Sequence, residues 1–292
     1  IGTLLERQKD YLNKDVCVCG WIETIRVQQK GGLSFISLTD GSCIKSLQII
    51  LSPETDEERS KLDTIYQDGT KGISIEVHGK IVESPAKGQD IELKCISLNI
   101  MGKVDASEYP IAKSKLKLDT IRQHLHLRPR TKTIAAIARI RNAMSIATHE
   151  FYQSHGFKYI HTPVLTGNDC EGAGETMSVS NTLGTGTDDE KQFFGKPVNL
   201  TVSGQLHGET YATALGDIYT FGPTFRAEES HTTRHLAEFW MIEPEICFID
   251  FKDLIDLAED YLKFCVNYCL DKCHDEIDFF TKHYQPTLKD DL

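Results

Sequence analysis

No stretch of the sequence reaches the ~18–20 uncharged apolar residues of a membrane-spanning helix, which argues against an integral helical membrane protein. Cys-x-x-Cys pairs and His-Glu-x-x-His patterns are also missing, so we predict no structural zinc and no other metal ligands. The nine cysteines form an odd set scattered over 292 residues, which does not fit a disulfide framework. Reduced thiols and a cytoplasmic location are the simpler expectation.

Basic residues are outnumbered, with 32 Lys and Arg against 43 Asp and Glu and a formal net charge of −11. Binding of nucleic acid by bulk charge is therefore excluded, and a polyanion must meet a local basic patch. The length favours two domains. We expect them at residues 1–102 and 131–292, joined by a basic hinge over 103–130 that is equally compatible with a solvated linker.

The first hundred residues are rich in β-forming runs. Apolar and β-branched residues gather at 16–22, 33–38, 47–51, 73–82 and 91–96. A charged, helix-compatible segment lies between the third and fourth runs, at 53–67. Five short strands with a helix after the third predict a small Greek-key barrel of the OB type, an architecture that often binds oligonucleotides.

Helical periodicity begins after the hinge. Apolar residues at helical spacing predict a helix over 133–155, followed by a short strand at 159–160 that stops before Pro163. A second amphipathic helix is predicted over 251–273. Its three cysteines, which recur every four residues, are interpreted as small packing residues rather than metal ligands.

The segment with the most chemistry is a predicted hairpin, with strands at 219–228 and 238–245 and a polar loop over 229–237. Period two places Arg226 and Glu228 on one face of the first strand, and Phe239 with Glu243 on one face of the second. A guanidinium matches phosphate oxygens, a carboxylate can accept from an exocyclic amine, and a ring can stack on a base. The alternative is a surface ion pair with Phe239 in the core.

Two segments together resemble a known family. The segment 225–228 with 233–239 resembles motif 2 of class II aminoacyl-tRNA synthetases, and 156–163 resembles the dimer-forming motif 1. A preceding OB-type domain is similar to the aspartate, asparagine and lysine subgroup. The resemblance implies an α+β fold, with a five-stranded OB-type barrel followed by a class II antiparallel-sheet catalytic domain. Nothing resembles motif 3, so we expect this domain to be incomplete at its C-terminal side.

The resemblance also implies ligands and site residues. ATP with Mg²⁺ is expected to bind through Arg226, Glu228, Arg234, His235 and Phe239. Of these, Arg226 at the α-phosphate and His235 at the outer phosphates are the implied catalytic residues. The amino acid is expected to bind through Glu171, Ser203, Gln205, Glu209 and Arg226. A homodimer is expected to form through residues 133–163.

In the barrel, Arg26, Phe35 and Gln48 match the positions at which the family binds the tRNA anticodon. One stacked base is worth ~1–3 kcal/mol, so a single exposed ring at Phe35 would matter. The alternative is that Phe35 and Leu33, which share a face, are both core residues. Ser37 on that same face favours the exposed position.

The segment 201–209 resembles the amino-acid pocket of the subgroup and identifies asparagine as the better substrate. Aspartyl members carry a lysine where this chain has Gly208, and here Glu209 follows instead. A carboxylate repels aspartate but accepts a hydrogen bond from an amide NH₂. The alternative for Glu209 is a solvated carboxylate at the end of a strand. We therefore expect an asparagine-activating ligase with tRNA(Asn) as its partner.

Three other functions stay open at this stage. An aspartyl-tRNA synthetase with a relaxed pocket is the nearest enzyme. A tRNA-binding paralogue without catalytic activity is favoured by the missing motif 3, but it would not need the residues of the hairpin. An asparagine synthetase on the same catalytic fold is disfavoured by the N-terminal barrel.

Overall fold

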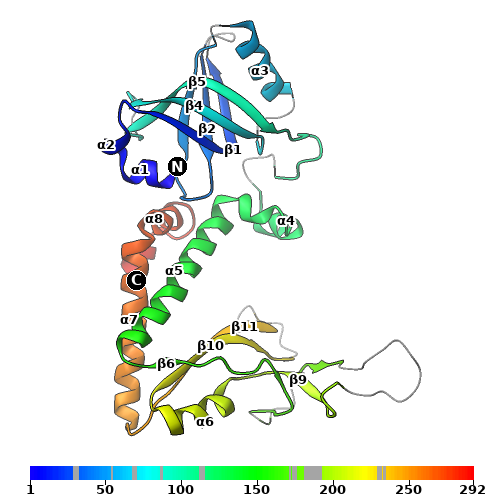
Figure 1. Ribbon diagram of the computed structural model, residues 1–292, viewed down its shortest axis with the longest axis vertical. Helices are drawn as coiled ribbons and strands as arrows, with labels where there is room; N and C mark the ends of the chain where they lie inside the picture. Colours follow the sequence, from blue (N-terminus) through cyan, green and yellow to red (C-terminus); the bar gives the residue numbers. More distant parts are fainter. Residues whose placement is uncertain are drawn as a thin grey trace, which may run out of the picture. The chain divides into compact units, whose positions relative to one another are not determined.

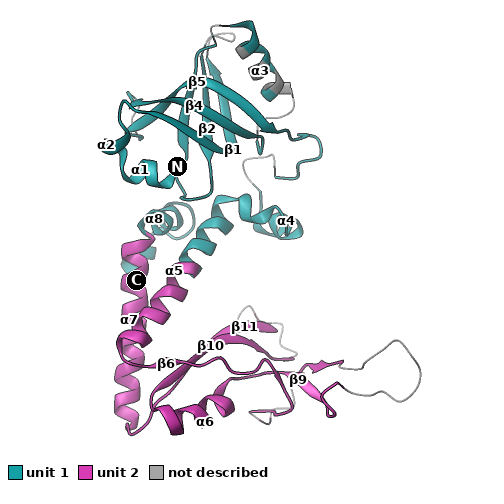
Figure 2. Cartoon of the chain, in the orientation of Figure 1, with its two compact units in different colours: residues 1–141, 274–291 teal, residues 142–273, 292 magenta. Residues whose placement is uncertain are grey.

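The computed structural model describes residues 1–28, 33–53, 55–67, 71–85, 88–111, 116–170, 172, 176–180, 193–228, 232 and 235–292. The chain divides into two compact units (Figures 1 and 2). Unit 1 contains residues 1–141 and 274–291, and unit 2 contains residues 142–273 with residue 292. The domain boundaries expected from the sequence, at 102 and 130, stay a prediction.

Unit 1 contains a closed five-stranded barrel, which confirms the OB-type barrel expected from the sequence (Figure 1). Its order is β1-β2-β3-β5-β4, and every pair is antiparallel except β3 with β5. The strands are β1 (Asp15–Gln28), β2 (Leu33–Thr39), β3 (Leu47–Leu51), β4 (Ser74–Glu83) and β5 (Ile91–Gly102). Helix α3 (Asp56–Gln67) follows the third strand, close to the predicted 53–67.

Strict alternation builds the core of the barrel. In β2, Ser34, Ile36 and Leu38 are buried, whereas Leu33 and Phe35 lie on the opposite, partly exposed face. The other strands contribute apolar side chains to the same core in the same way. Most of the buried residues are Ile, Leu or Val, which suit a pleated surface that is covered on one side.

Unit 1 also contains helices other than α3. These are α1 (Gly2–Glu6), α2 (Gln8–Tyr11), α4 (Leu118–Gln123), the 3₁₀ turn η1 (Arg128–Arg130), the start of α5 (Lys132–Ser154), α8 (His274–His283) and α9 (Leu288–Asp291). Arg139 of α5 donates from Nε to Glu276 of α8 over 2.6 Å. Because the Glu276 side chain is only 9% exposed, this ion pair satisfies a charge that would otherwise be costly to bury.

In its described residues, unit 2 contains two small sheets and three helices. One sheet has the order β11-β10-β6 and the other β7-β9-β8. The strands are β6 (Lys158–Tyr159), β7 (Leu165–Thr166), β8 (Ser178–Val179), β9 (Val198–Leu200), β10 (Ile218–Phe225) and β11 (Glu238–Glu245). The helices are the rest of α5, α6 (Gln205–Leu215) and α7 (Phe251–Lys272).

An aromatic cluster covers one face of the β11-β10-β6 sheet. Tyr219 of β10 is fully buried and stacks on Tyr152 of α5 with ring centres 4.8 Å apart. His149 of α5 and the Tyr219 hydroxyl share a hydrogen bond of 2.8 Å between Nδ1 and Oη. Residues of α7 such as Tyr261 pack against the same cluster. Period two in β10 therefore leaves Thr220 and Thr224 on the opposite face, toward α6.

The two long helices match the sequence predictions closely in extent. Helix α7 begins after Asp250, which accepts hydrogen bonds from the amides of Lys252 and Asp253 in a capping box. The three cysteines of this segment, Cys265, Cys269 and Cys273, are buried, as expected for packing residues. Among the residues that the structure describes, no helix combines the length and apolar character needed to cross a bilayer.

Candidate functional site

The predicted hairpin is present as β10 and β11, which pair antiparallel with Thr220 opposite Glu243 and Thr224 opposite Phe239. Strand β10 ends at Phe225, so Arg226 and Glu228 lie just beyond the strand rather than within it. The Arg226 amide still donates to the Ala237 carbonyl over 3.1 Å. The backbone at Arg226 therefore still lies beside the residue that precedes β11, although strand β10 has ended.

Two pairs of predicted site residues meet at the loop end of this hairpin. The guanidinium carbon of Arg226 lies 5.5 Å from the ring centre of Phe239, within the range of a cation–π contact. His235 Nε2 lies 3.3 Å from Glu228 Oε2, and this contact becomes an ion pair when the imidazole is protonated. A cation, an aromatic face and a carboxylate are thus available on one hairpin. Arg234 and Glu171 lie outside the described residues.

Glu243 is a hydrogen-bond acceptor for three groups on the α6 face of the sheet. It accepts from the Ser203 hydroxyl, from the Gly204 amide at 3.0 Å and from the Thr220 hydroxyl at 2.9 Å. Ser203 is buried and is held in one orientation by this contact. Sequence reasoning placed Glu243 beside Phe239 but assigned it no role. The signal was the period-two spacing of acidic residues in β11.

Gly204 is packed too closely to carry a side chain. A Cβ atom there would lie 2.8 Å from Thr162 Oγ1 and 3.1 Å from Glu243 Oε2. Its backbone carbonyl accepts from the Gly208 amide over 2.9 Å in the first turn of α6. The absence of a side chain therefore lets α6 start directly against Glu243.

The predicted amino-acid-binding residues Gln205 and Glu209 lie one turn apart on α6. Gln205 donates from Nε2 to Glu209 Oε1 over 2.9 Å, and both side chains are exposed. Glu209 is therefore a helix residue and not the strand-end carboxylate considered as its alternative. The thiol of Cys170, which precedes Glu171 in the chain, lies 3.9 Å from Gln205 Oε1.

Three carboxylates lie together where α6 meets β11. The pKa of Glu245 is raised from 4.5 to about 7 by its burial and by the negative charges of Glu209 and Glu243. Gly208, on the same turn of α6, is buried, and a Cβ atom there would contact Glu245 Cγ at 3.4 Å. This corner of unit 2 is therefore anionic, with a carboxyl group that titrates near neutrality.

A cavity of about 200 Å³ borders this site. It lies along β10 and the chain that follows β6, where Thr162, Gly204, Trp240 and Glu243 contribute to its wall. Of the predicted site residues that the structure describes, none lines this cavity. Gly204 and Glu243 line this cavity and also take part in the hydrogen bonds with Ser203 at the start of α6.

The three residues predicted to contact an anticodon share the outer face of the barrel. Arg26 of β1 is directly opposite Phe35 of β2, and Ser37 of β2 is directly opposite Gln48 of β3. Phe35 is partly exposed and lies outside the barrel core, which Ile36 and its neighbours fill. A ring flanked by a cation and an amide across three adjacent strands forms a suitable surface for an unpaired base.

Taken together, the OB-type barrel and the antiparallel hairpin with its Arg226 and Phe239 pair define a class II tRNA synthetase architecture. Residues 117–290 match a family described as tRNA synthetases class II (D, K and N), and residues 16–101 match the OB-fold nucleic acid binding domain. The chain belongs to this class II family of D, K and N synthetases. The family and the fold expected from the sequence are confirmed.

Among curated proteins, asparagine–tRNA ligases are similar to nearly the whole chain. The chain is 47% identical to the asparagine–tRNA ligase of Protochlamydia amoebophila over 285 residues, which cover 95% of this chain and 60% of the relative. It is 46% identical to the asparagine–tRNA ligase of Syntrophobacter fumaroxidans over 297 residues, 99% of this chain and 62% of the relative. The chain therefore spans about three fifths of the length of these curated relatives.

A solved structure shares the same fold. The crystal structure of asparaginyl-tRNA synthetase from Pyrococcus horikoshii complexed with asparaginyl-adenylate matches with a TM-score of 0.77 at 24% identity. The match covers 96% of this chain and 60% of that protein. At this level of identity the likeness shows the fold.

Proposed function

We propose that this chain belongs to an asparagine–tRNA ligase, which activates asparagine with ATP and transfers it to tRNA(Asn). The observation that carries this proposal is the anionic corner formed by Glu209, Glu243 and Glu245 beside Gly208. The high identity to asparagine–tRNA ligases over nearly the whole chain supports the same substrate.

The anionic corner favours asparagine over aspartate for an electrostatic reason. The side-chain carboxylate of aspartate, brought next to Glu209, would add a further negative charge where Glu245 already resists ionisation. An amide NH₂ in the same place donates hydrogen bonds and adds no charge. The family resemblance implies that aspartyl-tRNA synthetases have a lysine at the position of Gly208. A lysine there would reverse this preference.

ATP fits the described part of the hairpin. Arg226 would hold the α-phosphate through its planar guanidinium, while Phe239 stacks on the adenine and Glu228 accepts from the adenine amine. His235, which faces Glu228, would lie toward the outer phosphates together with Arg234. Mg²⁺ that accompanies the bound ATP would supply further charge neutralisation.

The chemical step needs positioning more than covalent participation by the protein. The carboxylate oxygen of asparagine attacks the α-phosphorus, a new P–O bond forms, and the bond to the leaving pyrophosphate breaks. Arg226 stabilises the charge that builds on the α-phosphate oxygens. A terminal ribose hydroxyl of tRNA then attacks the activated carbonyl and releases AMP.

Ser203, Gln205 and Glu171 would orient the ammonium and carboxylate groups of the amino acid, and Glu209 would accept from the carboxamide. The contact between Ser203 and Glu243 supports this arrangement, because it fixes the serine hydroxyl before substrate binds. Gln205, held by Glu209 over 2.9 Å, is similarly restrained. Preorganised groups of this kind lose little entropy when they bind a ligand.

Binding of tRNA(Asn) is assigned to the barrel face that carries Arg26, Phe35 and Gln48. A homodimer is assigned to the helix and strand over 133–163. Apolar side chains on α5 support this assignment, because Ile137, Met144 and Ile146 are 48%, 47% and 44% exposed. Exposed apolar residues on a long helix are typical of a protein–protein contact.

The test is ATP–pyrophosphate exchange on the natural gene product, with its intact mass measured on the same material. We expect exchange that depends on asparagine and not on aspartate. Exchange that depends on aspartate would identify the aspartyl enzyme. A protein that catalyses no ATP–pyrophosphate exchange but binds tRNA would contradict the proposed ligase activity and would identify a tRNA-binding paralogue.

A further inference from the structure

Four metal-binding side chains lie on one patch of the barrel, on the strand pair β1 and β4. Cys17 is directly opposite His78, and Cys19 is directly opposite Glu76. Residues two apart on a strand share a face, so all four side chains project from the same side. The residues between them, Val18 and Val77, are buried in the barrel core. The four side chains therefore project from the outer surface.

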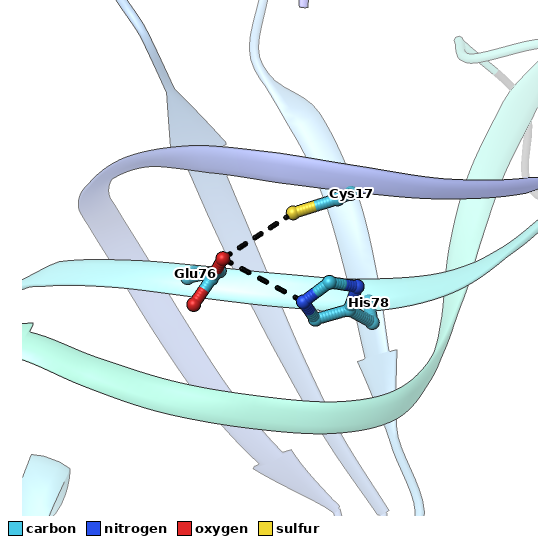
Figure 3. Close-up of side chains that lie close together, drawn as sticks. All are labelled: Cys17, Glu76 and His78. Atoms are coloured by element: carbon cyan, nitrogen blue, oxygen red, sulfur yellow. Dashed lines mark hydrogen bonds and ion pairs between the residues drawn. The ribbon is translucent and has the colours of Figure 1, made fainter.

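The distances match those of a small metal site. Glu76 Oε1 lies 3.5 Å from Cys17 Sγ and 3.6 Å from His78 Nε2, so one carboxylate oxygen contacts both groups (Figure 3). All three ligand atoms lie within 4.8 Å of one another. Zinc bonds of ~2.3 Å to sulfur and ~2.0–2.1 Å to nitrogen or oxygen place neighbouring ligands of a tetrahedral site roughly 3.3–3.7 Å apart.

We propose that Cys17, Cys19, Glu76 and His78 form a surface site for a thiolate-preferring divalent cation, with Zn²⁺ as the probe. Cys17, Glu76 and His78 supply three ligand atoms that already lie within 4.8 Å of one another. The Cys19 thiol, on the same face and opposite Glu76, would supply the fourth ligand of a tetrahedral set. Thiolate and imidazole ligands favour zinc over magnesium or calcium, which prefer all-oxygen sites.

A bound cation would neutralise the negative charge that the Glu76 carboxylate and the metal-bound thiolates bring together on this face of the barrel.

The backbone that holds the four side chains is firmly placed. Both strands are part of the closed barrel, and β4 carries a register shift between His78 and Gly79 against β5. Gly79 is packed so closely that a Cβ atom there would lie 2.3 Å from the Lys94 carbonyl oxygen. A glycine is therefore required beside His78, and the irregularity there fixes the direction of that strand.

This patch is separate from the proposed anticodon face on the same barrel. The patch lies where β1 pairs with β4, whereas Arg26 lies in the later part of β1, which pairs with β2. Zinc binding is therefore independent of the proposed ligase function. Failure of one would leave the other unaffected.

The test is titration of the reduced 292-residue chain with ZnCl₂ by calorimetry, and with Co²⁺ by absorption spectroscopy. We expect one ion per chain, and a Co²⁺ spectrum with thiolate charge-transfer bands and the visible bands of a tetrahedral complex. Cys17→Ser and His78→Gln should each weaken binding by more than the ~10–100-fold that loss of an outer-shell partner costs. The matched control is Cys43→Ser, since Cys43 is another free cysteine of the barrel unit that lies outside this patch.

A second readout follows the thiols themselves. Zinc should slow alkylation of Cys17 and Cys19 by iodoacetamide, measured by mass spectrometry, and leave Cys43 unchanged. Binding that persists in the Cys17→Ser and Cys19→Ser variants would overturn the proposal. So would a cobalt spectrum without thiolate bands, because it would place the ion on other groups.

Discussion

The guanidinium of Arg226 lies 5.5 Å from the ring centre of Phe239, across the end of the β10–β11 hairpin. This contact joins two residues that are 13 positions apart in sequence and that the family resemblance assigned to one nucleotide. The ring presents a π face to the cation, which helps to hold the guanidinium in place before ATP binds. In the proposed function, this one hairpin holds both the phosphate and the base.

Replacement of Arg226 by alanine should lower asparagine activation in the natural gene product by about a hundredfold or more, because a charge-stabilising donor is removed. Arg226→Lys should recover only part of this loss, since lysine keeps the charge but not the planar fork. ATP–pyrophosphate exchange measures both. Arg122→Ala, at an exposed arginine that pairs with Asp119, is the control. Equal rates in wild type and Arg226→Ala would remove Arg226 from the site.

Loss of the Glu243 acceptor should destabilise unit 2. Glu243→Gln leaves the donors of Ser203, Gly204 and Thr220 with a weaker acceptor, at a cost of about 1–3 kcal/mol. Urea unfolding of the chain measures the change in the free energy of unfolding. Glu238→Gln, at an exposed position on the same strand, should be neutral. An unchanged midpoint for Glu243→Gln would mean that these contacts contribute nothing to stability.

The raised pKa of Glu245 gives stability a definite pH dependence. In the folded chain its carboxyl group keeps the proton up to pH about 7, whereas an unfolded glutamic acid releases it near 4.5. Between these values the folded chain binds more protons than the unfolded chain, so the free energy of unfolding falls as the pH rises. Because the side chain is only partly buried, solvent screening reduces this effect to about 1 kcal/mol.

Glu245→Gln should remove that dependence. The variant should gain stability relative to wild type above pH 7 and show little gain near pH 4.5, where Glu245 is already neutral. Unfolding midpoints at the two pH values measure the difference. A variant that tracks wild type at both would show that burial and the charges of Glu209 and Glu243 do not act on this group.

Phe35 on the outer face of the barrel is predicted to contribute to tRNA binding but not to asparagine activation. Phe35→Ala should weaken tRNA(Asn) binding by about 1–3 kcal/mol, because one stacked base is lost. Asparagine-dependent exchange should not change. Leu33→Ala, on the same outer face, removes an apolar side chain without a ring and is the matched control. Equal losses in both variants would show that general packing rather than stacking is responsible.

Local patterns were enough to predict the barrel and the hairpin. Alternation in β2 grouped Phe35 with Leu33 and Ser37 on one face but left open whether that face is buried, and period two in β11 grouped Phe239 with Glu243. These inferences succeed because the repeat of a strand is set by the backbone and needs no knowledge of the partner.

Helix α6 was not predicted because its own sequence is unfavourable for a helix. Gly208 and the β-branched Thr210 and Thr213 lie within it and lower its intrinsic propensity. Its packing on β10 and β11, with Gly204 against Glu243, is a tertiary contact that local patterns do not contain. Its place in the structure puts Gln205 and Glu209 one turn apart.

The patch of Cys17, Cys19, Glu76 and His78 was missed for a related reason. The common zinc motifs use the spacings of metal-binding turns and helices, whereas these residues follow Cys-x-Cys and Glu-x-His along two strands. Only the register of β1 with β4 brings the two pairs together. A Cys-x-Cys repeat on one face of a predicted strand was the available signal.

The most direct test of the account is the affinity of this chain for non-hydrolysable analogues of asparaginyl-adenylate and aspartyl-adenylate, compared by calorimetry at neutral pH. The two ligands differ only where the anionic corner at Glu209 and Glu245 would meet them. The asparaginyl analogue should bind at least about tenfold more tightly, equivalent to about 1.4 kcal/mol. Equal affinities, or tighter binding of the aspartyl analogue, would contradict it.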